Sequence, residues 1–356
     1  MFNFGFKLGN FSFGSDRRKF LGIDIGGTVL KIIELENKEG KLYLSNYAWM
    51  EIPKIYSRSE KETETLFEIV YPEYIKKALK ESGIKSKNAY VGIATSGSLI
   101  MVIDFPQMEK EELNQAIRFE AQKYIPMPLE EISMSWEVIN SSDESTFSNS
   151  SKMQIFLAVV AKKNIALYEK CIKNSGLLLK KVEIESVATV KSLIGEDKKK
   201  FVVVDIGYMN CNIDYVENGF IKINRSISMG GNTLTNNIAR SLGISEERAE
   251  AMKLSGTNFF GSEMNIQLPT LEIISEEIKR ILKVASEKEA ISGVETIILT
   301  GGTSDLLGIA DFFQSRLGVK TILGNPFNRI NYDSRIESVL EAVKTKFPVS
   351  VGVTLK

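Results

Sequence analysis

The sequence predicts a two-lobed α/β fold, and an internal duplication is the main observation behind that prediction. Residues 20–26 read Phe-Leu-Gly-Ile-Asp-Ile-Gly and residues 201–207 read Phe-Val-Val-Val-Asp-Ile-Gly, and the two stretches align without a gap. Each is an apolar strand that ends in Asp-Ile-Gly and is followed by a second strand. The chain has 356 residues, enough for two lobes with a large core. One such hairpin in each lobe predicts a clamp for phosphate groups in the cleft between the lobes.

Composition excludes several classes of function. Lys and Arg total 45, as do Asp and Glu, so the zero net charge argues against a nucleic-acid binder held by bulk electrostatics. The absence of histidine removes the usual general base and the commonest metal ligand. Cys171 and Cys211 lie far apart, so they predict no thiolate zinc site and fit a reducing cytosol. No apolar run is long enough to cross a bilayer, so direct membrane insertion is not expected.

Hydrophobic periodicity predicts the elements of the first half of the chain. Strands are expected at 20–26, 29–35, 42–52 and 88–94. A helix is expected at 62–82, ended by Gly83 and either kinked or divided at Pro72. An inserted unit follows, with strands at 98–105, 132–139 and 153–160, a helix at 109–124 whose apolar stripe is Leu113, Ile117, Ala121 and Tyr124, and a mobile Ser-rich loop at 140–152. A helix at 163–174, a strand at 177–184 and a helix at 186–194 complete this half.

The charged segment 196–200 is the expected boundary between the lobes. After the repeated hairpin, a helix is expected at 233–242, capped by Asn232 and ended by Gly243, and another at 246–254, capped by Ser245. The remaining predicted elements are helices at 271–290, 305–317 and 334–344, a possible last helix at 348–355, and strands at 296–300 and 319–323.

These elements predict a domain organisation in five parts. An N-terminal tail at 1–19, partly ordered or docking on a partner, precedes the first lobe, which takes 20–96, 179–196 and 331–356. The inserted subdomain takes 97–178. The core of the second lobe takes 200–231 and 295–330, and a helical subdomain takes 232–294.

The first hairpin turn carries the residues expected to meet phosphate. Gly26 and Gly27 lack side chains, so backbone N–H groups can approach an anion closely. Thr28 offers a hydroxyl donor and Lys31 a positive charge. Asp24, at the end of the strand, can hold Mg²⁺ through water. A strand follows the turn and no Gly-Lys-Ser/Thr is present, so this is neither a Walker A loop nor a Rossmann fingerprint.

Two further pieces are expected to complete the cleft. Asp205 and Gly207 of the second hairpin would face the first, with Asp205 sharing the metal. Gly301 and Gly302, between a buried strand and a helix, would let a nucleotide lie against the backbone. Glu185 ends a strand at the crossing between lobes and could orient an attacking water, or could be only a solvated acid at a strand end. Glu250 and Lys253 could touch ribose or base, or could lie on a solvated helix face.

The order of hairpin, inserted unit, second hairpin and Gly-Gly turn resembles that of the actin-like ATPase superfamily, whose fold is ribonuclease H-like. Within it, roughly residues 18–356 resemble the PilM family, cytoplasmic actin-like components of type IV pilus assembly. The resemblance rests on segments 21–27, 91–97, 105–126, 226–231, 299–302 and 325–327, with Lys31. The three nucleotide motifs, which are the two Asp-Ile-Gly hairpins and the Gly301-Gly302 turn, specify only the superfamily. Segment 105–126 and Asn-Pro-Phe at 325–327 narrow it to PilM.

The resemblance implies ATP and Mg²⁺ between the lobes, with Asp24 and Asp205 near the metal and Glu185 and Asp205 as the catalytic pair. The residues it implies for the nucleotide are Asp24, Gly26, Gly27, Thr28, Lys31, Gly207, Asn210, Gly230, Gly231, Glu250, Lys253, Gly301, Gly302 and Thr303. It also implies a groove beside the inserted subdomain that takes the short cytoplasmic N-terminal tail of a PilN-type inner-membrane protein. Other implied partners are pilus assembly ATPases and further copies of the chain, and the implied location is the inner face of the cytoplasmic membrane.

One departure from the superfamily pattern bears on turnover. The second turn reads Tyr208-Met209-Asn210-Cys211-Asn212, where small or hydroxyl residues and then Asp are usual. The bulky side chains and missing carboxylate indicate slow hydrolysis or none, while ATP binding is still expected. Two alternatives remain open. One is a filament former like FtsA, and the other is a small-molecule kinase of the same superfamily, which would need an Asp base aimed at a substrate hydroxyl.

Overall fold

The computed structural model describes residues 6–7, 19–53, 59–108, 110–125, 127–141, 152–261, 264, 266–288 and 293–355. Most of the predicted tail at 1–19 lies outside these residues, and so does most of the predicted Ser-rich loop at 140–152. Within the tail, β1 (Phe6–Lys7) pairs antiparallel with β9 (Leu178–Ile184) at the edge of the first sheet.

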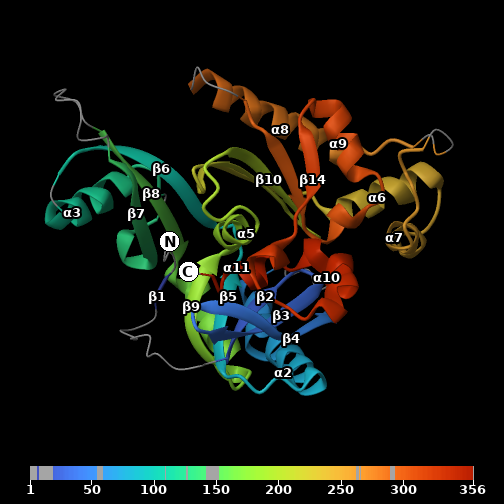
Figure 1. Ribbon diagram of the computed structural model, residues 1–356, viewed down its shortest axis with the longest axis horizontal. Coiled ribbons are helices and arrows are strands. Elements are labelled where there is room, and N and C mark those ends of the chain that lie inside the picture. The colour runs from blue at the N-terminus through green and yellow to red at the C-terminus, as the bar shows by residue number, and fades with distance from the viewer. Residues whose placement is uncertain are drawn as a thin grey trace.

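Two large sheets repeat one strand order, as the duplication predicts. The first runs β9-β5-β2-β3-β4, with β1 added outside β9, and the second runs β14-β13-β10-β11-β12. In each, the strand that ends in Asp-Ile-Gly pairs antiparallel with the next strand and parallel with a later one. Figure 1 shows the two sheets in separate lobes. The bounds are β2 (Lys19–Ile25), β3 (Val29–Lys38), β4 (Lys41–Glu51), β5 (Asn88–Ile93), β10 (Lys200–Ile206), β11 (Cys211–Glu217), β12 (Phe220–Ile227), β13 (Thr296–Thr300) and β14 (Lys320–Leu323).

Strand β12 was not among the predicted elements, and it is the counterpart of β4. Each follows a two-residue turn with positive φ at both positions, Glu39-Gly40 in the first lobe and Asn218-Gly219 in the second. Such turns match the twist of antiparallel strands. The sequence hides β12 because Lys222, Asn224 and Arg225 interrupt its apolar pattern.

The predicted helix at 62–82 is continuous but changes its winding before Pro72. It comprises α1 (Glu60–Thr65), a π-helical turn η1 (Leu66–Val70) and α2 (Tyr71–Ser82). Pro72 lies in the first turn of α2, where the altered hydrogen-bond pattern accommodates its missing N–H. Gly83 ends the helix with φ 70°, as predicted.

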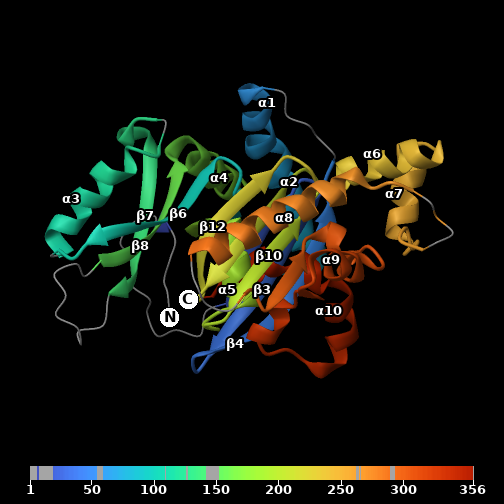
Figure 2. The same ribbon diagram turned by 90° about the horizontal axis from the view of Figure 1, so that it is seen from above.

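The inserted unit is a separate three-stranded sheet with its own helix, set to one side of the molecule (Figure 2). It contains β6 (Ser98–Pro106), β8 (Lys152–Ala161) and β7 (Ile132–Ser141) in that order, with α3 (Lys110–Ala121) and η2 (Leu129–Glu131). Leu113, Ile117 and Ala121 are buried as predicted. Tyr124 is not part of the stripe, because it lies beyond the end of α3 and is 47% exposed. Helix α4 (Lys162–Asn174) leads back to the first lobe.

Helix α5 (Glu185–Leu193) lies between the two lobes and packs closely on α11 (Pro348–Gly352). Two glycines permit this packing. A Cβ at Gly352 would stand 1.8 Å from the carbonyl oxygen of Ala188, and one at Gly22 would stand 1.8 Å from that of Ser350. The C-terminal elements therefore sit directly on β2 and α5. They are η4 (Pro326–Arg329), η5 (Ser334–Ile336), α10 (Glu337–Val343), η6 (Lys344–Lys346) and α11.

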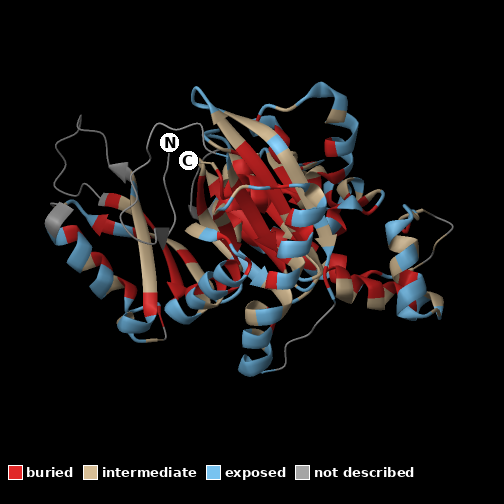
Figure 3. Ribbon diagram, turned by 90° about the horizontal axis from the view of Figure 1, so that it is seen from below, coloured by how far each residue is buried: buried red, intermediate tan, exposed pale blue. Residues whose placement is uncertain are grey.

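The second lobe carries α6 (Gly231–Leu242), α7 (Glu246–Leu254), α8 (Pro269–Lys288), η3 (Gly302–Asp305) and α9 (Ile309–Leu317). Gly243 ends α6 and Ser245 caps α7, as predicted. The predicted cap at Asn232 is wrong. Gly230 is the N-cap of α6, and the N–H of Asn232 donates to the carbonyl of Tyr208 instead. Figure 3 shows the buried residues concentrated in the central strands of the two large sheets.

Candidate functional site

The first hairpin turn holds a buried ion pair. Asp24 is 5% exposed, and its Oδ2 lies 2.9 Å from Nζ of Lys31, its cross-strand partner. Gly26 lies beneath this pair, since a Cβ there would stand 2.8 Å from Nζ of Lys31. The N–H of Gly26 closes the turn on the carbonyl of Val29, and the carbonyl of Thr28 accepts the N–H of Ile52. The turn is thus fixed by its own backbone, and Gly26 shapes it without a free N–H.

The second hairpin turn is fixed against the start of α6. The N–H of Gly207 donates to the carbonyl of Asn210, and the carbonyl of Gly207 accepts the N–H of Gly231 at 2.8 Å. A Cβ at Gly230 would stand 2.4 Å from the same carbonyl oxygen, so only glycine fits there. The phenol of Tyr208 donates to Oδ1 of Asn232 at 3.0 Å. Tyr208 is therefore held by α6.

The two turns face each other across the cleft, as the sequence predicts. A Cβ at Gly27 would lie 3.7 Å from Cβ of Tyr208 and 3.8 Å from Cγ of Met209. The gap at this point therefore has room for little more than a methyl group. Tyr208 and Met209 narrow the cleft in this structure.

The Gly301-Gly302 segment, which follows β13, lies beside the second hairpin turn. Gly301 has φ 87°, and a Cβ there would stand 2.5 Å from Oδ1 of Asp205. Its N–H donates to the carbonyl of Thr345. The hydroxyl of Thr303 donates to the carbonyl of Gly207 at 3.3 Å. Gly301 thus gives Asp205 its space, and Thr303 ties η3 to the second turn. Gly302 has no neighbour within 4 Å of an added Cβ.

Four charged side chains meet between the turns. Burial lowers the pKa of Lys31, but Asp24, Asp205 and Glu185 outweigh it, so the pKa is raised overall. Burial, with the neighbouring charge of Asp24, raises the pKa of Asp205 to about 6. Burial, followed by the charges of Asp24 and Asp205, raises the pKa of Glu185 to about 8. The site therefore holds excess negative charge with a single lysine among these groups.

Glu250 and Lys253 lie close to the second turn. Nζ of Lys253 is 2.7 Å from Oε2 of Glu250, and it donates to the carbonyl of Gly231 at 3.1 Å and to the hydroxyl of Thr235 at 2.9 Å. The side chain of Lys253 is only 7% exposed. These contacts pin α7 onto the first turn of α6. The solvated-face alternative is therefore wrong for Lys253.

The described residues at the two turns offer a phosphate group one lysine and glycine backbone. Gly27 of the first turn and Gly302 after β13 present backbone without side chains, and the charge of Lys31 suits phosphate. Among the described residues, no group of three or more His, Cys, Asp or Glu side chains is arranged to hold a metal ion. Asp24 is already paired with Lys31. A cation at this site would have to reach the carboxylates through water.

Several polar residues near the site escaped prediction. Asn212 pairs with Asp205 across the second hairpin, as Lys31 pairs with Asp24 across the first. It is 6% exposed, and its Oδ1 has no hydrogen-bond partner. The duplication itself could have identified this position, because the alignment places it opposite Lys31. Ser186 and Asp214 also lie buried nearby, and no sequence signal marks them.

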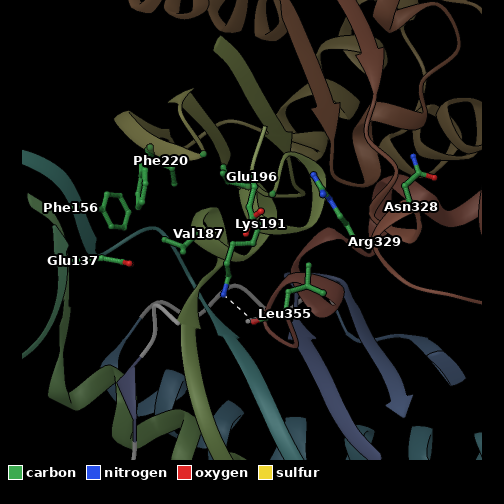
Figure 4. Close-up of a pocket in the computed structure, with 13 residues that line it drawn as sticks. Glu137, Phe156, Val187, Lys191, Glu196, Phe220, Asn328, Arg329 and Leu355 are labelled. Atoms are coloured by element: carbon green, nitrogen blue, oxygen red, sulfur yellow. Dashed lines mark hydrogen bonds between the residues drawn. The ribbon is translucent and has the colours of Figure 1, made fainter. Parts of the chain in front are cut away.

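A cavity of about 350 Å³ lies away from the turns, between the inserted unit and both lobes (Figure 4). Phe156 of β8 and Phe220 of β12 form an apolar wall, with ring centroids 5.8 Å apart. Lys191 of α5 lines the cavity and donates to the carbonyl of Leu355 at 3.3 Å. Burial raises the pKa of Glu137 in β7, which lines the opposite side. Helix α5 therefore reaches from Glu185 at the cleft to Lys191 at this cavity.

The fold and the facing hairpins define an actin-like ATPase fold. One solved structure with this fold, titled "PilM-PilN type IV pilus biogenesis complex", matches with a TM-score of 0.78 and 22% identity, covering 95% of this chain and 98% of that chain. The ethanolamine utilization protein EutJ from Carboxydothermus hydrogenoformans matches with a TM-score of 0.55 and 15% identity, covering 94% of this chain and 88% of that chain.

The chain belongs to the family of the type IV pilus assembly protein PilM, whose family model matches residues 22–356. The predicted fold and the predicted family are thus confirmed. Cell division protein FtsA from Pseudomonas aeruginosa is 26% identical over 196 residues, covering 48% of this chain and 46% of that protein. FtsA from Streptococcus pneumoniae serotype 2 is 21% identical over 349 residues, covering 86% and 75%. The chain spans about half the length of most of the curated relatives it matches. Within the described residues, no helix is both long and apolar enough to cross a membrane.

Proposed function

We propose that this protein is an ATP-binding scaffold of the type IV pilus assembly platform, which holds the cytoplasmic N-terminal tail of a PilN-type membrane protein in a nucleotide-sensitive way. The observation that carries the nucleotide part is the juxtaposition of the two turns, with Gly27 facing Tyr208 and Met209. The family match and the similarity to a PilM–PilN complex support the partner. Through that partner the protein would act at the inner face of the cytoplasmic membrane.

The nucleotide site would be assembled from both lobes. Lys31, with the backbone around Gly27, would contact phosphates from the first lobe, and the backbone at Gly302 would contact them from the second. The single Lys31 cannot compensate the several negative charges of a triphosphate, so a Mg²⁺ ion held through water by Asp24 and Asp205 would complete the charge balance. The remaining residues proposed for the nucleotide are Gly26, Thr28, Gly207, Asn210, Gly230, Gly231, Glu250, Lys253, Gly301 and Thr303.

Turnover is expected to be slow. Tyr208 and Met209 occupy space beside Gly27, where the second turn faces the first. A terminal phosphate would need that space. This favours binding without rapid hydrolysis, which suits a protein that switches its partner affinity rather than consuming ATP.

The partner tail is proposed to dock in the cavity between β7, β8 and α5. Its apolar wall of Phe156 and Phe220 suits apolar side chains, and its lining also contains charged residues of both signs: Glu137, Glu196, Lys191 and Arg329. Because α5 begins at the nucleotide site and ends beside this cavity, a movement of α5 would change both sites together. Pulldown and light scattering would also reveal pilus assembly ATPases or self-association as further partners.

A binding experiment tests both halves of the proposal. The synthetic N-terminal peptide of the PilN-type protein from the same organism would be titrated into the full chain by calorimetry, with and without MgATP. We expect tight MgATP binding, phosphate release far below ordinary enzyme rates, and a peptide affinity that depends on MgATP. Asp24→Ala should abolish nucleotide binding, while Glu36→Ala, at a partly exposed residue of the same hairpin, should not. Rapid phosphate release, or peptide affinity unchanged by MgATP, would contradict the proposal.

A further inference from the structure

A buried chain of hydrogen bonds runs beneath the cleft. The hydroxyl of Thr95 donates to Oγ of Ser186 at 3.1 Å, and the N–H of Ser186 donates back to Oγ1 of Thr95 at 3.0 Å. Nδ2 of Asn224 lies 3.4 Å from Oγ of Ser186 and 2.5 Å from Oδ1 of Asp214. Thr95, Ser186 and Asp214 are each no more than 2% exposed.

The hydrogen-bond capacity of Ser186 is completely used. Its hydroxyl accepts from Thr95 and from Asn224, and it donates its one proton to the carboxylate of Asp214. When Asp214 is ionised, its carboxylate only accepts hydrogen bonds, and the direction of the chain then runs from Thr95 toward Asp214. Removing that acceptor would leave a buried donor unpaired, which costs more than the bond itself contributes.

The chain joins three parts of the fold. Thr95 follows β5 of the first lobe, Ser186 lies in the first turn of α5, and Asp214 and Asn224 belong to β11 and β12 of the second lobe. Figure 1 shows α5 between the two sheets. The backbone N–H of Thr95 also hydrogen-bonds the carboxyl group of Glu185 at the nucleotide site. One residue, Thr95, is therefore bonded both to Glu185 and to the link with the second lobe.

We propose that Asp214, Asn224 and Ser186 form a buried latch that fastens the second lobe to α5 and positions Glu185 through Thr95. The latch is closed when Asp214 accepts from Ser186. This inference rests on the proposed nucleotide site for its functional consequence, because the closed latch favours the closed lobes that would hold ATP. Asp214 and Ser186 are positioning residues, because they act on the carboxyl group of Glu185 through Thr95.

The surroundings of Asp214 are consistent with this role. Burial raises its pKa to about 7, although the hydrogen bonds from Asn224 and Ser186 oppose that rise. The titratable groups that face it are Asp205 of β10, whose charge adds to the rise, and the thiol of Cys211 on its own strand. No lysine or arginine is among the groups that set its pKa. The ionised form of Asp214 is therefore stabilised by its hydrogen bonds from Asn224 and Ser186.

The first test measures the latch without any nucleotide. Hydrogen exchange of the full chain, resolved to the amides of residues 95 and 186, would compare wild type with Ser186→Ala and Asp214→Asn. Asp214→Asn keeps the shape but replaces one of the two acceptor oxygens with an amide donor, so Asn224 and Ser186 can no longer each donate to a separate oxygen. We expect exchange at these two amides to become about fivefold faster in both variants, the equivalent of one hydrogen bond. The control Ile213→Val changes the neighbouring buried residue of β11, which packs in the core of the second lobe, and should leave both amides unchanged.

The second test measures the consequence for the proposed site. Ser186→Ala should weaken MgATP binding about fivefold, because loss of the latch shifts the lobes toward the open form. Ile213→Val should bind MgATP like wild type. Unchanged exchange at residues 95 and 186 in either latch variant overturns the latch. If exchange rises while MgATP affinity is unchanged, the proposed coupling to Glu185 is wrong. If wild type itself fails to bind MgATP, the proposed function fails, and the exchange experiment still decides the latch.

Discussion

The Asp24–Lys31 pair allows a sharp test of the site, because it is buried and has an exposed counterpart on the same hairpin. Lys31→Met removes the charge but keeps much of the aliphatic side chain. The side chains of Asp24 and Lys31 are 7% and 16% exposed. Lys31 also faces Asp205 and Glu185, so the variant leaves three carboxyl groups without their shared cation.

The expected cost follows from burial. Breaking a buried ion pair by removing one partner typically costs about 3–5 kcal/mol, and we expect about 3 kcal/mol here because Lys31 retains some contact with solvent. The matched control is Lys38→Met on the same strand. Lys38 pairs with Glu36 at 3.2 Å, but its side chain is 52% exposed, and exposed pairs contribute about 0–1 kcal/mol.

Urea unfolding without nucleotide, followed by tryptophan fluorescence, would measure both variants. The double variant Asp24→Asn/Lys31→Met should recover much of the loss, because no uncompensated carboxylate remains at residue 24. The reasoning is refuted if Lys31→Met costs no more than Lys38→Met. It is also refuted if the double variant is less stable than Lys31→Met alone.

Three further predictions use other features of the cleft. In the same urea titration, Gly301→Ala should destabilise the protein by about 2 kcal/mol or more, and Gly302→Ala by less than about 1 kcal/mol. The two differ because only residue 301 has a positive φ and a position where an added Cβ would meet Asp205. The pKa values of Asp205 and Glu185 are raised on folding, so the stability that they contribute is present below about pH 4 and is lost as the pH rises toward about 8. Between pH 5 and pH 8, the free energy of unfolding of Glu185→Gln should therefore fall less than that of wild type. Parallel curves for the two proteins would contradict this prediction. Both cysteines are buried, and burial raises the pKa of Cys171 to about 12, so a thiol reagent should label them only on unfolding; fast labelling of the native protein would count against this.

The sequence was sufficient for the framework of the fold. The duplicated Asp-Ile-Gly strands predicted one such hairpin in each lobe, and apolar periodicity located most of the helices and strands. The facing of the two turns also followed from the duplication. Local signals with one physical cause, such as glycine at the end of a helix or serine before one, were reliable at Gly83, Gly243 and Ser245.

What could not be predicted depends on contacts distant in the sequence. Asn232 is a good N-cap by residue type, but its side-chain oxygen accepts a hydrogen bond from the phenol of Tyr208 in the preceding turn. The polar residues of β12 concealed a strand, because Asn224 faces a buried carboxylate rather than solvent. The hydrogen-bonded chain from Thr95 to Asp214 joins distant segments, since Thr95 and Ser186 are already 91 positions apart. No local sequence pattern marks such a network.

The close packing of α11 on β2 has a consequence for biosynthesis. The ribosome releases the strand with Gly22 long before it releases the segment around Ser350 and Gly352 that covers this strand. The second lobe, which is continuous from β10 to β14, can fold before α11 is synthesised and packs on β2 of the first lobe. Nascent chains halted before α11 should therefore contain a protease-resistant second lobe beside a first lobe that is still cleaved.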